Sequence, residues 1–218
     1  MKSIAGLLAA LLCAAALASA DEAAPAAAPA PALSRVSLGA HLSYWDAKDL
    51  DAIDLDGAIG GGIIGQVRLL DSLALEMRLS GYGAGSTSDV FIEGEGWYEN
   101  DTVIVCMPLE AGFVAFLPVG ESFRFYGGPG IGYYVFDGEF TTTQGPVETT
   151  INMDLDEAAG FYAVFGGRVQ LARNAALFLE GQYTWVETAL RREVGPIRAD
   201  NDLDFSGLSL SAGMIFTF

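Results

Sequence analysis

Apolar and polar residues alternate along much of this chain. Every second residue is apolar in four segments: 36–44, 73–81, 177–185 and 208–218. Successive side chains of a β-strand point to opposite faces, so each segment predicts a strand with one apolar and one polar face. Four less regular segments also predict strands: 57–69, 102–117, 123–136 and 158–171. Helical periodicity is weak throughout, and the pattern therefore predicts eight strands.

The connections between these strands alternate between long and short. The long ones are 46–56, 85–101, 137–157 and 187–205, and the short ones are 70–72, 118–122 and 172–175. Successive connections of an antiparallel meander lie at opposite ends, so the long loops gather at one end and the short turns at the other. The sequence thus predicts an all-β fold, an eight-stranded antiparallel up-and-down β-barrel. Pro108 and Pro129 lie inside predicted strands and predict bulges or irregular pairing there.

Charge is scarce and unevenly placed. Only 18% of the 218 residues are charged, and 28 acids against 11 bases give a net charge of -17. The four long loops hold 21 of the acids, so the rest of the chain is nearly neutral. An acidic chain lacks the basic face that nucleic acid requires, which excludes nucleic acid as a partner.

The first 32 residues have a different composition from the rest. Lys2, an apolar run and a small-residue site at 18–20 predict a signal peptide over residues 1–20. Residues 21–32 are rich in Ala and Pro and predict a tether. The predicted barrel domain occupies residues 33–218. Removal of the signal peptide leaves Cys106 as the one cysteine, which excludes an intrachain disulfide.

Periodicity alone does not say which face of the barrel is inside. A soluble lipocalin-like barrel has its apolar face inward, whereas a membrane barrel has it outward. The polar face here is rich in Gly and Ser with few charges, which suits a crowded lumen. Six charged residues are predicted to point into it, where three acids and three bases can cancel: Glu76, Arg78, Glu110, Arg124, Arg168 and Glu180.

Aromatic residues concentrate near the predicted strand ends, as in the aromatic girdles of membrane barrels. Those expected towards the long loops are Tyr44, Tyr82, Trp97, Tyr98, Tyr133, Tyr183 and Trp185. Those expected towards the short turns are Phe116, Phe123, Phe125 and Phe218. Together with the polar face, they favour a transmembrane β-barrel.

The final strand carries a family resemblance. Its last apolar series is Leu210, Ala212, Met214, Phe216 and Phe218. A terminal Phe preceded by apolar residues at every second position resembles the assembly signal of Gram-negative outer-membrane proteins. Residues 33–218 as a whole resemble the small OmpA-type β-barrel superfamily. The resemblance implies the outer membrane of a Gram-negative bacterium, with outer-membrane lipids and the assembly machinery as partners.

Two segments resemble cofactor-binding or metal-binding motifs, but the residues around them do not fit such sites. Residues 60–65 match G-x-G-x-x-G, but they lie within one predicted strand rather than between a strand and a helix. Residues 200–204 begin like a calcium loop but lack its Gly and distal Glu, which leaves only weak divalent binding by acidic loops open. We therefore expect no cofactor, no metal site and no catalytic residue.

Three functional hypotheses follow. The first is a non-enzymatic outer-membrane barrel with a structural role or a surface-interaction role, in which the acidic loops meet a ligand that the sequence does not specify. The second is a narrow pore or a conduit for small hydrophobic molecules. The third is a lipid A-modifying enzyme, because His41 and Ser43 have the spacing that lipid A deacylases use on one strand face. In that case Asp54 or Asp56 would orient the histidine.

Overall fold

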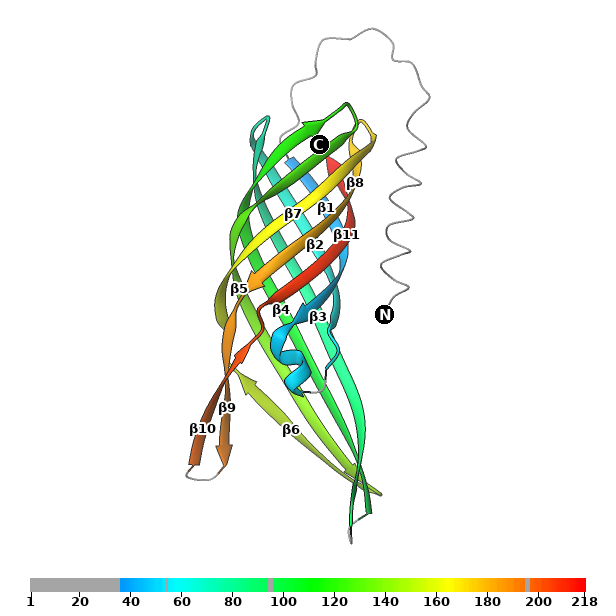
Figure 1. Cartoon of the computed structure of the whole chain (residues 1–218), viewed down its shortest axis with the longest axis vertical. Coiled ribbons are helices and arrows are strands. Elements are labelled where there is room, and N and C mark those ends of the chain that lie inside the picture. Colours follow the sequence, from blue (N-terminus) through cyan, green and yellow to red (C-terminus); the bar gives the residue numbers. More distant parts are fainter. Residues whose placement is uncertain (1–35, 54, 94–95, 195–196) are drawn as a thin grey trace.

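The computed structural model describes residues 36–53, 55–93, 96–194 and 197–218, so the predicted signal peptide and tether lie outside the described residues (Figure 1). The elements are β1 (Val36–Ala47), η1 (Lys48–Ile53), β2 (Ala58–Leu70), β3 (Leu73–Ile92), β4 (Gly96–Val119), β5 (Phe123–Gln144), β6 (Val147–Leu155), β7 (Ala158–Ala172), β8 (Ala175–Trp185), β9 (Glu187–Val194), β10 (Ile197–Asp204) and β11 (Gly207–Thr217). Among the described residues, no helix has the length and apolar character needed to cross a membrane.

Eight of the strands close into a ring (Figure 1). The order is β1-β2-β3-β4-β5-β7-β8-β11, and every neighbouring pair is antiparallel. The ring closes between β1 and β11, which pair from Ser37↔Thr217 to Ala47↔Gly207. Closure removes both edges of the sheet from the wall. The prediction of an eight-stranded antiparallel up-and-down barrel is confirmed.

One end of the barrel extends into long hairpins. Strands β3 and β4 continue as a pair to Ile92 and Gly96, β5 continues to Gln144 and returns as β6, and β9 pairs with β10. The predicted long connections over 85–101, 137–157 and 187–205 do lie at one end, but they consist largely of paired strands rather than loops, whereas 46–56 contains the short helix η1. Threonine side chains contribute cross-strand bonds there, such as Thr87 Oγ1 to Asp101 (2.6 Å) and Thr141 to Thr150 (3.1 Å). We call this end the hairpin end.

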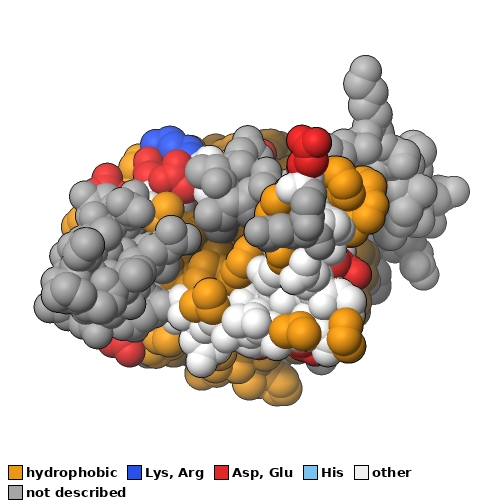
Figure 2. Space-filling model, turned by 90° about the horizontal axis from the view of Figure 1, so that it is seen from below, with side chains coloured by type: hydrophobic (Ala, Val, Ile, Leu, Met, Phe, Trp, Pro, Cys, Tyr) orange, Lys and Arg blue, Asp and Glu red, His pale blue; other side chains and the backbone are white. Residues whose placement is uncertain are grey.

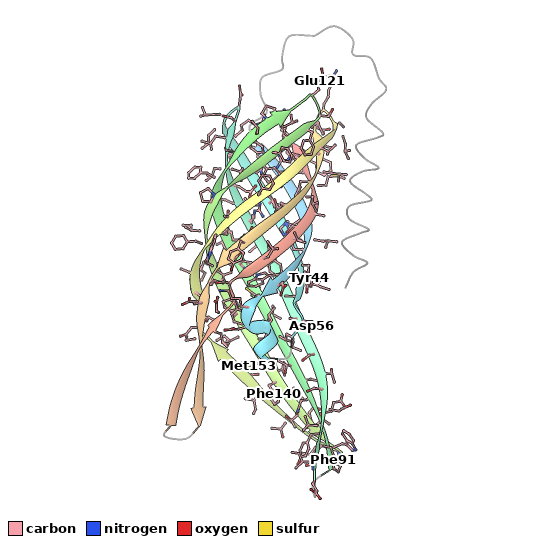
Figure 3. All side chains as sticks on the ribbon, viewed as in Figure 1. Tyr44, Asp56, Phe91, Glu121, Phe140 and Met153 are labelled. Carbon is pink, nitrogen blue, oxygen red and sulfur yellow. The ribbon has the colours of Figure 1, made fainter. Side chains whose placement is uncertain are left out.

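The opposite end carries three tight turns, and we call it the short-turn end. The turns lie between β2 and β3, between β4 and β5, and between β7 and β8, as predicted. Gly120, in the second of them, has a φ of 77°, which residues with a Cβ rarely adopt. Figure 3 shows Glu121 of this turn at the opposite end of the molecule from Phe91.

Pro108 and Pro129 interrupt the hydrogen bonding between strands but do not shift the register of the pairing. Beside Pro108, the β3–β4 pairing passes from Leu79↔Leu109 to Tyr82↔Cys106 in one unbroken register. The β4–β5 pairing beside Pro129 behaves in the same way. Irregular pairing is thus present, but the predicted bulges are not, because a missing N–H costs one hydrogen bond and requires no extra residue. The register shifts lie near two short turns, in β2 and β7.

The outer wall is apolar and the interior is filled. Leu42 is 76% exposed and Phe161 is 68% exposed, and both lie on the outward face. Inside, one apolar cluster around Phe116, Tyr126 and Phe178 occupies the short-turn half. A second cluster around Trp45, Phe136 and Phe205 occupies the hairpin half. The buried charges Glu76, Arg78, Glu110 and Glu180 occupy inward positions of β3, β4 and β8 between the two clusters.

Glycines on the inner face make room for tyrosine rings. A Cβ atom on Gly130 would lie 2.2 Å from Cζ of Tyr162, and one on Gly132 would lie 2.6 Å from Cε2 of Tyr134. Both rings are almost completely buried. These glycines therefore relieve crowding in a narrow barrel.

Substitution of Gly130 by alanine is expected to destabilise the barrel by about 1–3 kcal/mol, the usual cost of overpacking a filled interior. The measurement is the midpoint of urea unfolding in detergent micelles. Gly83→Ala is the matched control, because nothing lies within 4 Å of its added Cβ. Equal midpoints for the two variants would show that the Tyr162 ring moves aside at no cost.

Candidate functional site

A charged network closes the middle of the lumen, and Arg78 is its centre. Its guanidinium donates to Glu76 (Nε to Oε1, 2.6 Å) and to Glu180 (Nη2 to Oε2, 3.0 Å). It also donates to Oε1 of Gln182 at 3.1 Å. Gln66 donates to the second oxygen of Glu76. These side chains come from β2, β3 and β8, so the network crosses the barrel from one wall to the other.

Neutral donors complete the network. The Tyr126 hydroxyl donates to Glu180 at 2.6 Å, and the Tyr134 hydroxyl donates to Glu110 at 2.8 Å. Nε2 of Gln182 donates to the same oxygen of Glu110 at 2.7 Å. Buried charges are tolerated when they are paired and hydrogen-bonded, and this network meets both conditions for Glu76, Arg78 and Glu180.

The structure places five of the six predicted charges inside the barrel and buried: Glu76, Arg78, Glu110, Arg168 and Glu180. Arg124 also lies on the inward face but is only half-buried, near the short-turn end. The pairing differs from three simple acid–base pairs. Two carboxylates share Arg78, Glu110 binds phenol and amide groups, and Arg168 donates to Gln66 at 3.1 Å. The sequence analysis did not identify the tyrosines, although their positions in the alternation place them inside.

Two small cavities lie in the lumen, one between Trp45, Tyr82 and Phe205 and another between Tyr82, Glu110 and Thr184. Each offers about 10 Å³ to the centre of a water molecule. That space is about enough for one water molecule.

The structure does not bring together the residues that the hypothesis of a lipid A-modifying enzyme requires. Nε2 of His41 lies 3.2 Å from Oγ of Ser80, whereas Ser43 bonds to Ser211 at 2.8 Å. Nδ1 of His41 has no hydrogen-bond partner among the described residues, so no carboxylate orients the ring there. Asp54 lies outside the described residues, and Asp56 is exposed, where its carbonyl accepts from Tyr44. Cys106 is buried in the lumen.

The hairpins carry two chemically different faces. On the outward side of β3, β4 and β5 lie Asp89, Glu99, Asp101 and Glu139, and Asp89 stands directly opposite Glu99. The described residues of the inward side are uncharged. At the tip, the exposed rings of Phe91 and Trp97 pack with centroids 5.2 Å apart. Figure 2, a view of the hairpin end, shows acidic side chains mainly towards the periphery, with hydrophobic and uncharged polar atoms between them.

Ion pairs on this end are few among the described residues. Lys48 in η1 donates to Asp204 of β10 at 2.7 Å. This hydrogen bond and the charge of Asp204 raise the pKa of the exposed Lys48 ammonium. Asp204 was part of the calcium-like segment 200–204, and the side chains of 200–202 lie outside those described. No group of three His, Cys, Asp or Glu side chains among the described residues is placed to hold a metal ion.

The closing strand has the predicted apolar row outward. Leu210, Met214, Phe216 and Phe218 are exposed and Ala212 is half-buried, all on the outer side of β11. Four of the predicted girdle aromatics are elsewhere. Tyr82 and Phe116 are buried in the lumen, because their places in the alternation of β3 and β4 point inward. Trp97 and Tyr98 lie near the tip of the β3–β4 hairpin, beyond the wall.

Comparisons with known proteins agree with this architecture. Residues 6–216 match the model of the outer membrane protein beta-barrel domain. Among solved structures, the chain is similar to the outer membrane protein OprG from Pseudomonas aeruginosa, with 13% identity, a TM-score of 0.60, and coverage of 85% of this chain and 97% of that one. It is also similar to the outer membrane protein AlkL in lipid bilayers, with 16% identity, a TM-score of 0.52, and coverage of 91% and 96%.

No curated protein matches the sequence. The two structural likenesses show the fold, and the family match covers nearly the whole chain. The apolar outer wall is the surface that this family places against lipid, and the outer membrane is its location. The chain belongs to the family of the outer membrane protein beta-barrel domain.

Proposed function

We propose that the protein is a non-enzymatic outer-membrane barrel that conducts no solute and acts at the cell surface through its hairpins. The observation that carries the proposal is the filled lumen, which the Arg78 network crosses in the middle and apolar side chains occupy on both sides. Eight strands enclose a space that side chains just fill. His41 and Ser43 bond to different partners, Ser80 and Ser211, which supports a role without catalysis.

Planar-bilayer recordings test the closed lumen. We expect the refolded protein to give no steady current above the baseline, because the Arg78 network crosses the lumen and the two cavities beside it each hold about one water molecule. An open porin added to the same membrane serves as the sensitivity control. A reproducible steady current from the protein would reject this part of the proposal and favour the pore or conduit.

Outer-membrane barrels have their short turns in the periplasm and their longer connections outside the cell. The hairpin end therefore faces the outside, and its chemistry indicates the partner. Exposed acids lie along the outward face of β3–β5, and an aromatic pair lies at the tip. A basic polypeptide with apolar side chains complements both features, because aromatic residues anchor interfaces and opposite charges steer association. We therefore propose a basic protein surface as the ligand of the hairpins.

Binding of a labelled peptide rich in Lys and Trp tests this partner. We expect the triple variant Asp89→Asn/Glu99→Gln/Asp101→Asn to bind it more weakly than the parent, and we expect the difference to shrink as salt screens the charges. Asp71→Asn, on the short-turn side, is the matched control and should bind like the parent. Equal binding by all three proteins would contradict a role for the acidic face.

A further inference from the structure

The short-turn end is the basic end of this acidic protein. Among the described residues, four arginines lie there: Arg68, Arg124, Arg168 and Arg173. The carboxylate side chains at that end are those of Asp71 and Glu121, both in exposed turns. The short turns of outer-membrane barrels face the periplasm, so this end is the periplasmic one. The positive charge therefore lies on the side opposite the acidic hairpins.

Three of these arginines converge on the mouth of the lumen. Arg124 of β5 and Arg168 of β7 are direct partners across the two strands, and both lie on the inward face. Arg68 occupies an inward position of β2, across the barrel. The positive charge of Arg124 acts on Arg68, and that of Arg68 acts on Arg168, whose charge is partly offset by Glu76 and Glu180. The three guanidinium groups thus form one cluster, whereas Arg173 lies in a turn outside it.

Their hydrogen-bonding capacity is largely unused. The guanidinium groups of Arg68 and Arg124 form no hydrogen bond or ion pair with any described residue, and only the charge of Asp71 offsets Arg68. Arg168 is 7% exposed, and its Nε has no hydrogen-bond partner within the described part of the chain. Its one hydrogen bond goes to Gln66. An unpaired buried donor is costly, so such a group indicates a partner that completes it.

Arg168 is also held in a fixed position. Its Cζ lies 5.3 Å from the ring centroids of both Phe116 and Tyr126, so the guanidinium lies against two aromatic faces. Aromatic faces stabilise a guanidinium while its N–H groups remain free to donate in the plane. The side chain is therefore pre-organised for an acceptor.

We propose that Arg68, Arg124 and Arg168 form a binding site for a phosphate group at the periplasmic mouth of the lumen. A phosphate monoester carries close to two negative charges and three acceptor oxygens, which matches three guanidinium groups better than a carboxylate does. Arg68 and Arg124 are only half-buried at this end, so the phosphate arrives from the periplasm either as a soluble ion or on a phospholipid headgroup. The site lies at the opposite end from the proposed surface ligand and does not depend on it.

Titration calorimetry of the full barrel in an uncharged maltoside detergent tests the site, with inorganic phosphate as the first probe. We expect saturable binding by the parent that is about 10-fold or more weaker in Arg68→Gln/Arg124→Gln, since charge-assisted hydrogen bonds are lost. Arg173→Gln is the control and should bind like the parent. Arg168 is left intact because its removal exposes the aromatic rings of the interior. The shift in gel mobility on heating verifies that each variant is folded.

The second probe is a short-chain phosphatidic acid in the same detergent, because its headgroup is a phosphate monoester. Tighter binding of this lipid than of phosphate, again weakened in the double variant, assigns the headgroup as the source. Comparable binding of both probes assigns the soluble ion. The proposal is overturned if the double variant binds both probes as tightly as the parent, if Arg173→Gln weakens binding equally, or if the parent binds neither.

Discussion

Replacement of Arg78 by methionine is expected to destabilise the barrel by about 3–5 kcal/mol, the cost of removing one partner of a buried ion pair. Arg78 is the one cation that contacts both Glu76 and Glu180, and all three side chains are buried. Without it, two carboxylates remain in the lumen with only neutral donors. The readouts are the urea midpoint in micelles and the fraction of protein that migrates as the folded form in unheated gels.

A second variant separates charge from packing. Arg78→Met combined with Glu76→Gln and Glu180→Gln removes all three charges, so it should be less destabilised than Arg78→Met alone, because contacting residues are not additive. Arg173→Gln, which removes an exposed turn arginine, should leave the midpoint unchanged. If the triple variant were the least stable protein of the series, the single variant would owe its loss to packing rather than to uncompensated charge.

The Arg78 network bears on two of the functional hypotheses, the surface-interaction barrel with a closed lumen and the narrow pore. A passage along the axis would require Arg78, Glu76 and Glu180 to part, and their bonds join opposite walls. The apolar clusters on either side would have to open as well. This arrangement supports the proposed closed interior, in which the hairpins are the part that meets other molecules.

Alternation in the sequence was enough to predict the faces of the wall. Glu76, Arg78, Glu110, Arg168 and Glu180 are inward because a two-residue period fixes the side of every residue in a strand. The partner of each charge depends on the register between strands, which no single-strand pattern contains. For this reason, the sharing of Arg78 by two acids was not predictable, nor was the binding of Glu110 by Tyr134 and Gln182.

Two other differences have similar causes. The extended hairpins are polar on one face and rich in Thr, so a hydrophobic pattern that identifies wall strands ends before they do. Apolar residues that face lipid identify the strands of the wall in the sequence. Beyond the wall, the backbones of the hairpin strands remain paired, as at Asp89 and Glu99, but no such apolar row identifies them. Tyr82 and Phe116 were placed in the girdles by their distance from the strand ends, although the alternation already placed them inside.

Deletion of Phe218 is expected to reduce the yield of assembled barrel in the outer membrane strongly while leaving the finished barrel nearly as stable as the parent. The side chain is 69% exposed at the short-turn rim, and its backbone N–H donates to Val36 at 2.9 Å. Substitutions on the lipid face near an interface cost about 0–1 kcal/mol, so little stability depends on this ring. The resemblance of the last strand to the assembly signal implies that the ring is recognised before closure, when β11 has yet to pair with β1.

Two measurements on each variant distinguish recognition from stability: the amount in isolated outer membranes and the urea midpoint after refolding in detergent. Phe218→Tyr keeps an aromatic terminus and should keep the yield. Leu117→Ala removes an exposed apolar side chain at the same end, where Leu117 is 64% exposed, and should also assemble normally. If Phe218 is recognised during assembly, only the deletion variant should combine a low outer-membrane yield with a normal urea midpoint. A deletion that assembles as well as the parent would make Phe218 an interfacial residue with no part in insertion, because the same pairing of β11 with β1 would then form without it.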